Sequence, residues 1–233
     1  FRAEMLSDNR IREIHDFPDA SSVFPGVQIK GGVCFFLWDR DIEGLCKITN
    51  YLNDERTTVQ RPLLEEGAET FIRYNQAISI LKKVKNKKES IIKNQISARK
   101  PFGLDTKFKG AKKRSRNNST ALYQNGGIGY IMPENISVNT DLIGKFKVLI
   151  PPVGSGSDSF PHPILGIPFV TKPDSACTET YLVAGSFDTL EESQSLTSYL
   201  KTKFLRFMVL LNKPSQHATS KVYEFVPIQI WDR

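Results

Sequence analysis

Lysine and arginine crowd one part of this 233-residue chain in a pattern that favours binding to a polyanion. Residues 82–116 contain fourteen Lys and Arg but only two acids, Glu89 and Asp105, so this window carries a charge of +12. The whole chain carries +7, which leaves −5 for all the other residues. Solvated surfaces usually mix charges of both signs, so a one-sided excess indicates contact with phosphates. A basic solubilising stretch is the alternative interpretation.

One pattern is similar to a metal-dependent nuclease site. Asp19 follows Pro18, and Gln28 and Lys30 stand nine and eleven residues later. In such a site two acids hold Mg²⁺ and a lysine steadies the attacking water, but Gln28 occupies the place of the second acid. A nuclease therefore stays an alternative rather than the preferred interpretation.

Other candidate motifs lack the residues that their chemistry needs. Ile150-Pro-Pro-Val153 has neither an acceptor for an amine nor an aromatic ring for a base, so it is interpreted as a strand end. Gly154-Ser-Gly156 precedes three prolines rather than a helix, which argues against a cofactor loop. The three histidines have no metal-ligand spacing and no nearby nucleophile, so each is expected to be structural or exposed; they are His15, His162 and His217.

Composition limits the class of protein. Hydrophobic residues make up 39% and charged residues 24%, as in ordinary globular domains. No apolar run is long enough to cross a bilayer, and the charged first residues do not form a signal peptide. The three cysteines have no paired spacing, which suits a reducing cytoplasm and argues against a disulfide framework or a zinc site.

The elements of the first part predict one edge of an α/β sheet. Residues 11–17 alternate apolar and polar side chains after a short helix, which predicts a strand. Residues 33–38 are apolar at every position, as expected for a strand buried on both faces, and residues 44–51 predict a weaker strand beside it. The chain begins without Met in a helical pattern, so we expect the earlier strands of this sheet to lie in a longer protein.

A helix and a basic connector are expected next. The helix should start near Glu69 and place Phe71, Tyr74, Ile78 and Leu81 on one face. Residues 86–119 are polar and basic and predict an exposed connecting loop.

The last part predicts a self-contained α+β domain. A hairpin is expected over 122–132 around Asn125-Gly126-Gly127, with strands at 146–150 and 181–184. A helix starting near Thr189 should carry an apolar face as far as Leu211, and an extended segment should span 222–231.

Four segments resemble, in order, the C-terminal part of N6-adenine-specific DNA methyltransferases of restriction–modification systems. They are residues 17–40 (FPDASSVFPGVQIKGGVCFFLWDR), 96–104 (ISARKPFGL), 198–207 (SYLKTKFLRF) and 216–227 (QHATSKVYEFVP). The resemblance spans nearly the whole chain. It implies the end of a Rossmann-like catalytic domain over 1–66, a helical and basic connector over 67–119, and a target-recognition domain over 120–233.

The resemblance also implies roles for particular residues. In this family an aromatic residue near the end of the catalytic domain stacks on the target adenine after it leaves the duplex, and Phe24 holds the matching position. The alternative is that Phe24 plugs the edge of the sheet. Phosphates of duplex DNA would be held by basic residues, and the candidates are Lys30, Arg99, Lys100, Lys107, Lys109, Lys112, Lys113, Arg114 and Arg116.

This chain departs from the family in one respect. The cofactor loop and the catalytic Asn/Asp-Pro-Pro-aromatic motif are absent here and would precede Phe1. We therefore expect a methyl group from S-adenosylmethionine to reach adenine N6 only in the intact enzyme. This chain alone should be inactive, with no cofactor and no metal bound. Expected partners are double-stranded DNA, the N-terminal catalytic region and a restriction endonuclease; a non-catalytic specificity subunit or RNA-binding module stays an alternative.

Overall fold

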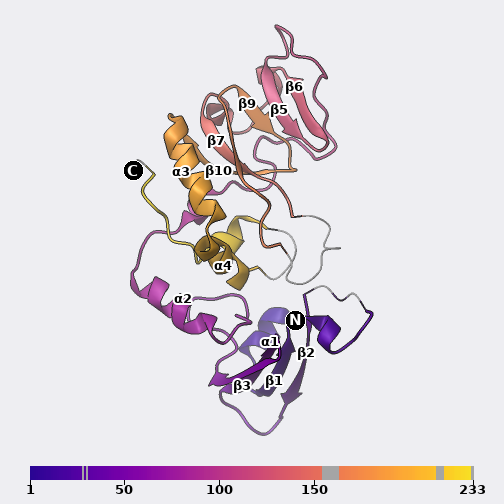
Figure 1. Ribbon diagram of the computed structural model, residues 1–233, viewed down its shortest axis with the longest axis vertical. Coiled ribbons are helices and arrows are strands. Elements are labelled where there is room, and N and C mark those ends of the chain that lie inside the picture. Colours follow the sequence, from indigo (N-terminus) through magenta and orange to yellow (C-terminus); the bar gives the residue numbers. More distant parts are fainter. Residues whose placement is uncertain (28, 30, 154–162, 214–217, 232–233) are drawn as a thin grey trace. The chain divides into compact units, whose positions relative to one another are not determined.

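The protein has a mixed α/β fold with several small sheets and few helices (Figure 1). This computed structural model describes residues 1–27, 29, 31–153, 163–213 and 218–231. The chain divides into two compact units, and the division falls between Lys88 and Glu89. Among the described residues, no helix combines the length and the apolar character that a membrane span requires.

The first unit is built on a four-stranded sheet. It contains α1 (Arg2–Ser7), β1 (Ile11–Phe17), β2 (Val33–Trp38), β3 (Cys46–Leu52) and β4 (Glu55–Arg61), with a short 3-10 turn η1 (Ala20–Ser22) after β1. The strand order is β2-β1-β3-β4; β1 and β3 are parallel and the other pairs antiparallel. The expected short helix and the strands at 11–17, 33–38 and 44–51 are thus confirmed. The expected place of the strand at 44–51 beside the strand at 33–38 is wrong, because β1 lies between β2 and β3 and pairs with both. The buried side of the sheet packs Ile14, Cys46 and Ile48 against Leu63.

The expected burial of β2 on both faces is wrong. β2 is the edge strand, and Phe35, Phe36, Leu37 and Trp38 expose between 43% and 58% of their surface. Among the described residues β2 pairs only with β1. The apolar run predicted the strand correctly, but a pattern of residue types does not show whether a neighbour covers the strand.

The hairpin of β3 and β4 was not expected from the sequence. Leu52 pairs with Glu55, so Asn53 and Asp54 form a two-residue turn, and both have positive φ (49° and 64°). Two positive φ values are characteristic of the type I′ turn, which Asn and Asp tolerate. The Asn-Asp pair was the available signal, but β4 is too polar to stand out by hydrophobicity.

The helix expected from Glu69 begins later, as α2 (Ala77–Asn86). The preceding segment is irregular and is hydrogen-bonded to the sheet: the Asn75 N–H donates to Asn50 Oδ1 (2.8 Å), and Asn75 Nδ2 donates to the Ile48 carbonyl (2.9 Å). These bonds replace the backbone bonds of a helix, so Phe71 and Tyr74 are not on the helix as expected.

The second unit contains two three-stranded sheets with the orders β10-β7-β8 and β6-β5-β9. The strands are β5 (Thr120–Gln124), β6 (Gly127–Ile131), β7 (Phe146–Ile150), β8 (Phe169–Thr171), β9 (Ser175–Cys177) and β10 (Leu182–Phe187). Two 3-10 turns, η3 (Pro133–Asn135) and η4 (Thr140–Leu142), connect β6 to β7. The hairpin around Asn125-Gly126-Gly127 and the strands at 146–150 and 181–184 are confirmed.

The expected C-terminal helix is divided in two: α3 (Leu190–Lys201) and α4 (Lys203–Leu211). Thr189 caps α3 as expected, and its side chain accepts from the Glu192 N–H. Thr202 has an extended backbone, and its Oγ1 accepts from the Leu205 N–H (3.2 Å) and donates to the Tyr199 carbonyl (2.8 Å). The apolar periodicity continues across this break, which explains why the sequence predicted one helix.

Part of the expected connector packs into the core of the second unit. Ile92 in the short turn η2 (Ile92–Gln95), together with Phe102 and Leu104, is buried. The C-terminal segment also differs from expectation. It begins with the 3-10 turn η5 (Ser220–Tyr223), and Pro227 then forms an isolated bridge with Ile91.

Candidate nucleic-acid interface

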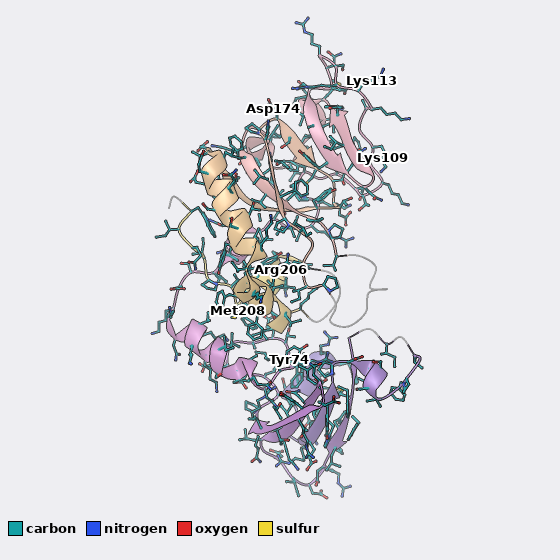
Figure 2. All side chains as sticks on the ribbon, viewed as in Figure 1. Tyr74, Lys109, Lys113, Asp174, Arg206 and Met208 are labelled. Atoms are coloured by element: carbon teal, nitrogen blue, oxygen red, sulfur yellow. The ribbon has the colours of Figure 1, made fainter. Side chains whose placement is uncertain are left out.

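Six exposed cations lie on one segment beside the β5–β6 hairpin, which we call the strap (residues 107–116). They are Lys107, Lys109, Lys112, Lys113, Arg114 and Arg116. Within the part of the chain that the structure describes, none of the six has a carboxylate within 4.0 Å. Figure 2 shows Lys109 and Lys113 at the edge of the unit where the hairpin lies. The strap is therefore a concentrated positive surface without internal counter-charges.

Close backbone contact fixes the strap to the hairpin. The Ala111 N–H donates to the Tyr130 carbonyl (2.7 Å), and the Tyr130 N–H donates back to the Ala111 carbonyl (2.9 Å). A Cβ at Gly110 would lie 2.7 Å from the Tyr130 oxygen, so only glycine permits this approach. The Gly110 N–H also donates to Gln124 Oε1 (2.8 Å). Since the backbone is anchored here, the strap cations are held near a defined surface.

Arg99 and Lys100 differ from the strap because the fold pairs them. Arg99 contacts Glu179, and Lys100 contacts Asp105 with Glu179 nearby at 3.9 Å. The hydrogen bond to Asp105 raises the pKa of Lys100 and lowers the pKa of Asp105. These two cations would have to share their charge with a carboxylate, so the strap residues are the better phosphate ligands.

Other cations of the basic window also have partners in the fold. Lys82 lies 3.6 Å from Glu65, and Lys93 lies 3.2 Å from Glu224. The Lys85 ammonium donates to the Glu66 carbonyl. The sequence window thus contains both cations that form ion pairs within the fold and the six exposed cations of the strap.

Phe24 lies in the loop after η1 and is 48% exposed. The Phe24 N–H donates to the Ala20 carbonyl (2.9 Å), which holds the residue near the end of β1. Three neighbouring apolar side chains, Val23, Val27 and Ile29, are also exposed. About half of the surface of this residue is thus open to solvent, which leaves room for a stacking partner. Lys30 lies outside the described residues.

The nuclease alternative gains little from the structure. Asp19 caps η1, accepting from the Ser21 N–H (3.0 Å) and the Ser21 hydroxyl (2.7 Å). Gln28 and Lys30 lie outside the described residues, as do Gly154–Gly156, His162 and His217. Among the residues that can be placed, no group of three or more His, Cys, Asp or Glu side chains could hold a metal ion. His15 packs between rings, stacked on Phe35 at 4.6 Å, with Nδ1 2.9 Å from the Tyr51 hydroxyl.

A buried polar network at the ends of β1 and β3 was missed by sequence reasoning. Asp16 is only 2% exposed and forms an ion pair with Arg73 (3.0 Å between Oδ2 and Nε). Burial raises the pKa of Asp16 to about 6, although the Arg73 charge opposes this shift. Asn50 joins the network by donating to the Arg73 carbonyl (2.8 Å). The network holds the segment before α2 against the sheet.

A buried lysine in the second unit has a structural role. Lys147 is fully buried, and its ammonium donates to the Lys145 carbonyl and to Ser175 Oγ, both at 2.9 Å. Burial lowers the pKa of Lys147 to about 8. Ser175 in turn donates to the Lys172 carbonyl, so its hydroxyl proton is engaged in the fold. This Lys–Ser pair braces the β7–β9 region and does not form an open nucleophilic site.

No protein-family model and no curated protein sequence matches this chain.

Proposed function

We propose that this chain is the DNA-binding and target-recognition part of a restriction–modification N6-adenine DNA methyltransferase. The observation that carries the proposal is the strap, whose six exposed cations have no carboxylate within 4.0 Å among the described residues. Residues 106–133, which include the strap and the hairpin, contain no Asp or Glu. Unpaired, anchored cations gain most when they meet phosphates, because bound counterions are then released.

The exposed edge of the first unit supports the proposal that its sheet completes a larger catalytic sheet. β2 presents apolar side chains on both faces and an unpaired backbone edge within the described residues. Such an edge is a template for another strand, and proteins rarely leave one uncovered. We therefore propose that β2 is covered by strands of the catalytic region of the intact enzyme.

That catalytic region would also hold S-adenosylmethionine. A cofactor loop of this kind ends at the N-terminus of a helix and is rich in glycine. The longer helices α2, α3 and α4 are preceded by Gln76, Thr189 and Thr202. None of these helix starts among the described residues has the glycine-rich loop that the cofactor needs. This chain would therefore bind the DNA and recognise its sequence, while the catalytic region would transfer the methyl group to N6.

The strap can be tested by the salt dependence of DNA binding. Removing one phosphate-binding cation lowers the slope of log affinity against log salt by about 0.9 on duplex DNA. Replacing Lys112, Lys113, Arg114 and Arg116 together with alanine should flatten the slope by roughly two to four units. Phosphate contacts carry no sequence information, so binding to all duplexes should weaken by similar factors. Titration of a labelled duplex at several salt concentrations measures the slope.

A matched control removes the same charge elsewhere. It replaces four exposed cations outside the basic window with alanine: Arg2, Lys172, Lys201 and Lys203. This variant has the same net charge as the strap variant and should keep most of the wild-type slope. An unchanged slope in the strap variant, or an equal decrease in both variants, would show that the duplex does not lie on the strap.

Phe24 can be tested in the intact enzyme. If its ring stacks on the flipped adenine, Phe24→Ala should reduce methylation about tenfold to a hundredfold, because a base–aromatic contact contributes roughly 1–3 kcal/mol. Phe24→Trp and Phe24→Tyr should retain much of the activity. Equal reductions in all three variants, together with lower melting temperatures, would instead favour a role in packing the sheet edge.

A further inference from the structure

The tip of the β5–β6 hairpin is exposed but firmly held. Gln124 pairs with Gly127, so Asn125 and Gly126 form a two-residue turn, and Gly126 has a φ of +90°. Gln124 Oε1 accepts from the Gly110 N–H, and the Lys109 ammonium donates to the Asn125 carbonyl. The tip is thus tied to the strap at two points, and its geometry is set before any ligand arrives.

The chemistry of the Asn125 side chain indicates that its ligand is a base. Asn125 is exposed, and no hydrogen bond of its carboxamide is found among the described residues. A carboxamide carries an N–H donor and an oxygen acceptor side by side. Adenine presents the complementary pair in the major groove, the N7 acceptor and the N6 amino donor. An exposed amide on a turn whose backbone is held next to a cation therefore matches adenine in a duplex.

The surroundings of the tip allow entry into the groove. Only the end of the hairpin would enter, because β9 pairs with β5 as far as Tyr123 and the strap backbone lies along β6 at Tyr130. Paired strands lie about 4.8 Å apart, so the two strands with the strap beside them span about 10 Å, which fits the major groove of about 12 Å. No acidic residue occurs between residues 106 and 133, so neither strand of the hairpin would be repelled by the phosphates on either side. The side chain of Ile128, near the start of β6, is 54% exposed and could contact a thymine methyl group.

We propose that the β5–β6 hairpin enters the major groove and that Asn125 reads the N6 and N7 edge of one adenine there. This inference rests on the proposed function and deepens it by assigning a base-reading residue. The adenine that Asn125 reads stays paired and stacked in the duplex, so it is distinct from the adenine that is methylated. Strap cations would hold the flanking phosphates while the amide provides selectivity.

The test uses the full chain and a pool of duplexes with a randomised centre. Selection by the wild-type chain should enrich a motif that contains a fixed adenine. Replacing that adenine with 7-deazaadenine removes only the N7 acceptor and leaves Watson–Crick pairing intact. The wild-type chain should then bind about fivefold to a hundredfold more weakly, as expected when a bidentate base contact is broken. Asn125→Ala should bind both duplexes equally.

Two further variants separate base reading from turn formation. Asn125→Asp keeps a residue type that hairpin turns favour but removes the amide donor. This variant should therefore bind the adenine duplex and the 7-deazaadenine duplex equally. Gln194→Ala removes an exposed amide on α3 and should retain the wild-type response. Melting temperatures of all variants report whether the hairpin is still folded.

The outcomes distinguish this inference from the proposed function. An N7 effect of the same size in the wild type and in Asn125→Ala would overturn the role of Asn125. Salt-dependent binding without any enriched motif would also overturn it, but would leave the strap as a DNA-binding surface. Absence of binding to any duplex would overturn both.

Discussion

Replacing Arg61 with alanine is expected to lower the free energy of unfolding by about 3–5 kcal/mol, because the change leaves buried polar groups without a partner. The Arg61 side chain is 5% exposed and lies 3.7 Å from Glu65, which is 8% exposed. Arg61 also donates to Asn75 Oδ1 (3.1 Å) and to the Ile72 carbonyl. Its removal would take the Arg61 donor from the Asn75 and Ile72 oxygens and would leave buried Glu65 with Lys82 as its cation, at 3.6 Å. Urea unfolding followed by circular dichroism measures the decrease.

Arg56→Ala is the matched control for this prediction. Arg56 stands on the same strand but on an exposed position, where its guanidinium lies over the Tyr51 ring at 5.9 Å. Removing one exposed cation–π interaction should lower the free energy of unfolding by no more than about 1 kcal/mol. Equal destabilisation by the two variants would show that the buried network does not hold the segment before α2.

Asp16→Asn should change the way stability depends on pH. Burial raises the pKa of Asp16 from 3.8 to about 6 in the folded chain, so between these values the folded chain holds a proton that the unfolded chain has lost. The contribution of this proton to the free energy of unfolding is fully present below 3.8, the pKa of Asp16 in the unfolded chain, and is lost as the pH rises through about 6. Above pH 7 the charged carboxylate therefore destabilises the fold by about 3 kcal/mol, and asparagine avoids this penalty.

The free energy of unfolding of both proteins between about pH 3.5 and pH 8 checks this prediction. The two should be nearly equal at the acidic end, and the Asp16→Asn variant should be the more stable by up to about 3 kcal/mol at the basic end. Asp41→Asn, at a carboxylate of the same unit whose side chain is 75% exposed, is the matched control and should change the free energy of unfolding by less than about 1 kcal/mol. A variant of Asp16 that is less stable at pH 8 would mean that the Arg73 pair outweighs the burial of the charge.

Several strands, one hairpin and the start of one helix could be predicted from the sequence, because interactions between neighbouring residues determine them. The strands at 11–17, 33–38 and 146–150 follow from short runs of apolar or alternating side chains, a pattern that favours extended structure. The β5–β6 hairpin follows from Asn125-Gly126, because a turn of two residues selects these types. Thr189 begins α3 because its side chain caps the first free N–H groups. Each of these signals acts over a few neighbouring residues.

Only the tertiary structure decided which side chains are free to act. The basic window forms one block of charge in the sequence. In the fold, however, Lys82, Lys93 and Lys100 each form an ion pair, with Glu65, Glu224 and Asp105 respectively. The strap remains unpaired among the described residues, because residues 106–133 contain no acid and Gly110 ties the strap to the hairpin. Charge counts along a sequence cannot separate these two groups, since ion pairing depends on distance in space.

The same limit explains the errors about β2 and α2. An all-apolar strand is suited to burial, but whether β2 is covered depends on a neighbour that the pattern of its own residues does not contain. The stripe from Phe71 to Leu81 fits a helix, but hydrogen bonds that join Asn75 to Asn50 and Ile48 of the distant strand β3 keep its first half out of a helix. Periodicity records which residues prefer burial, while long-range hydrogen bonds and edge exposure are set only when the whole chain has folded.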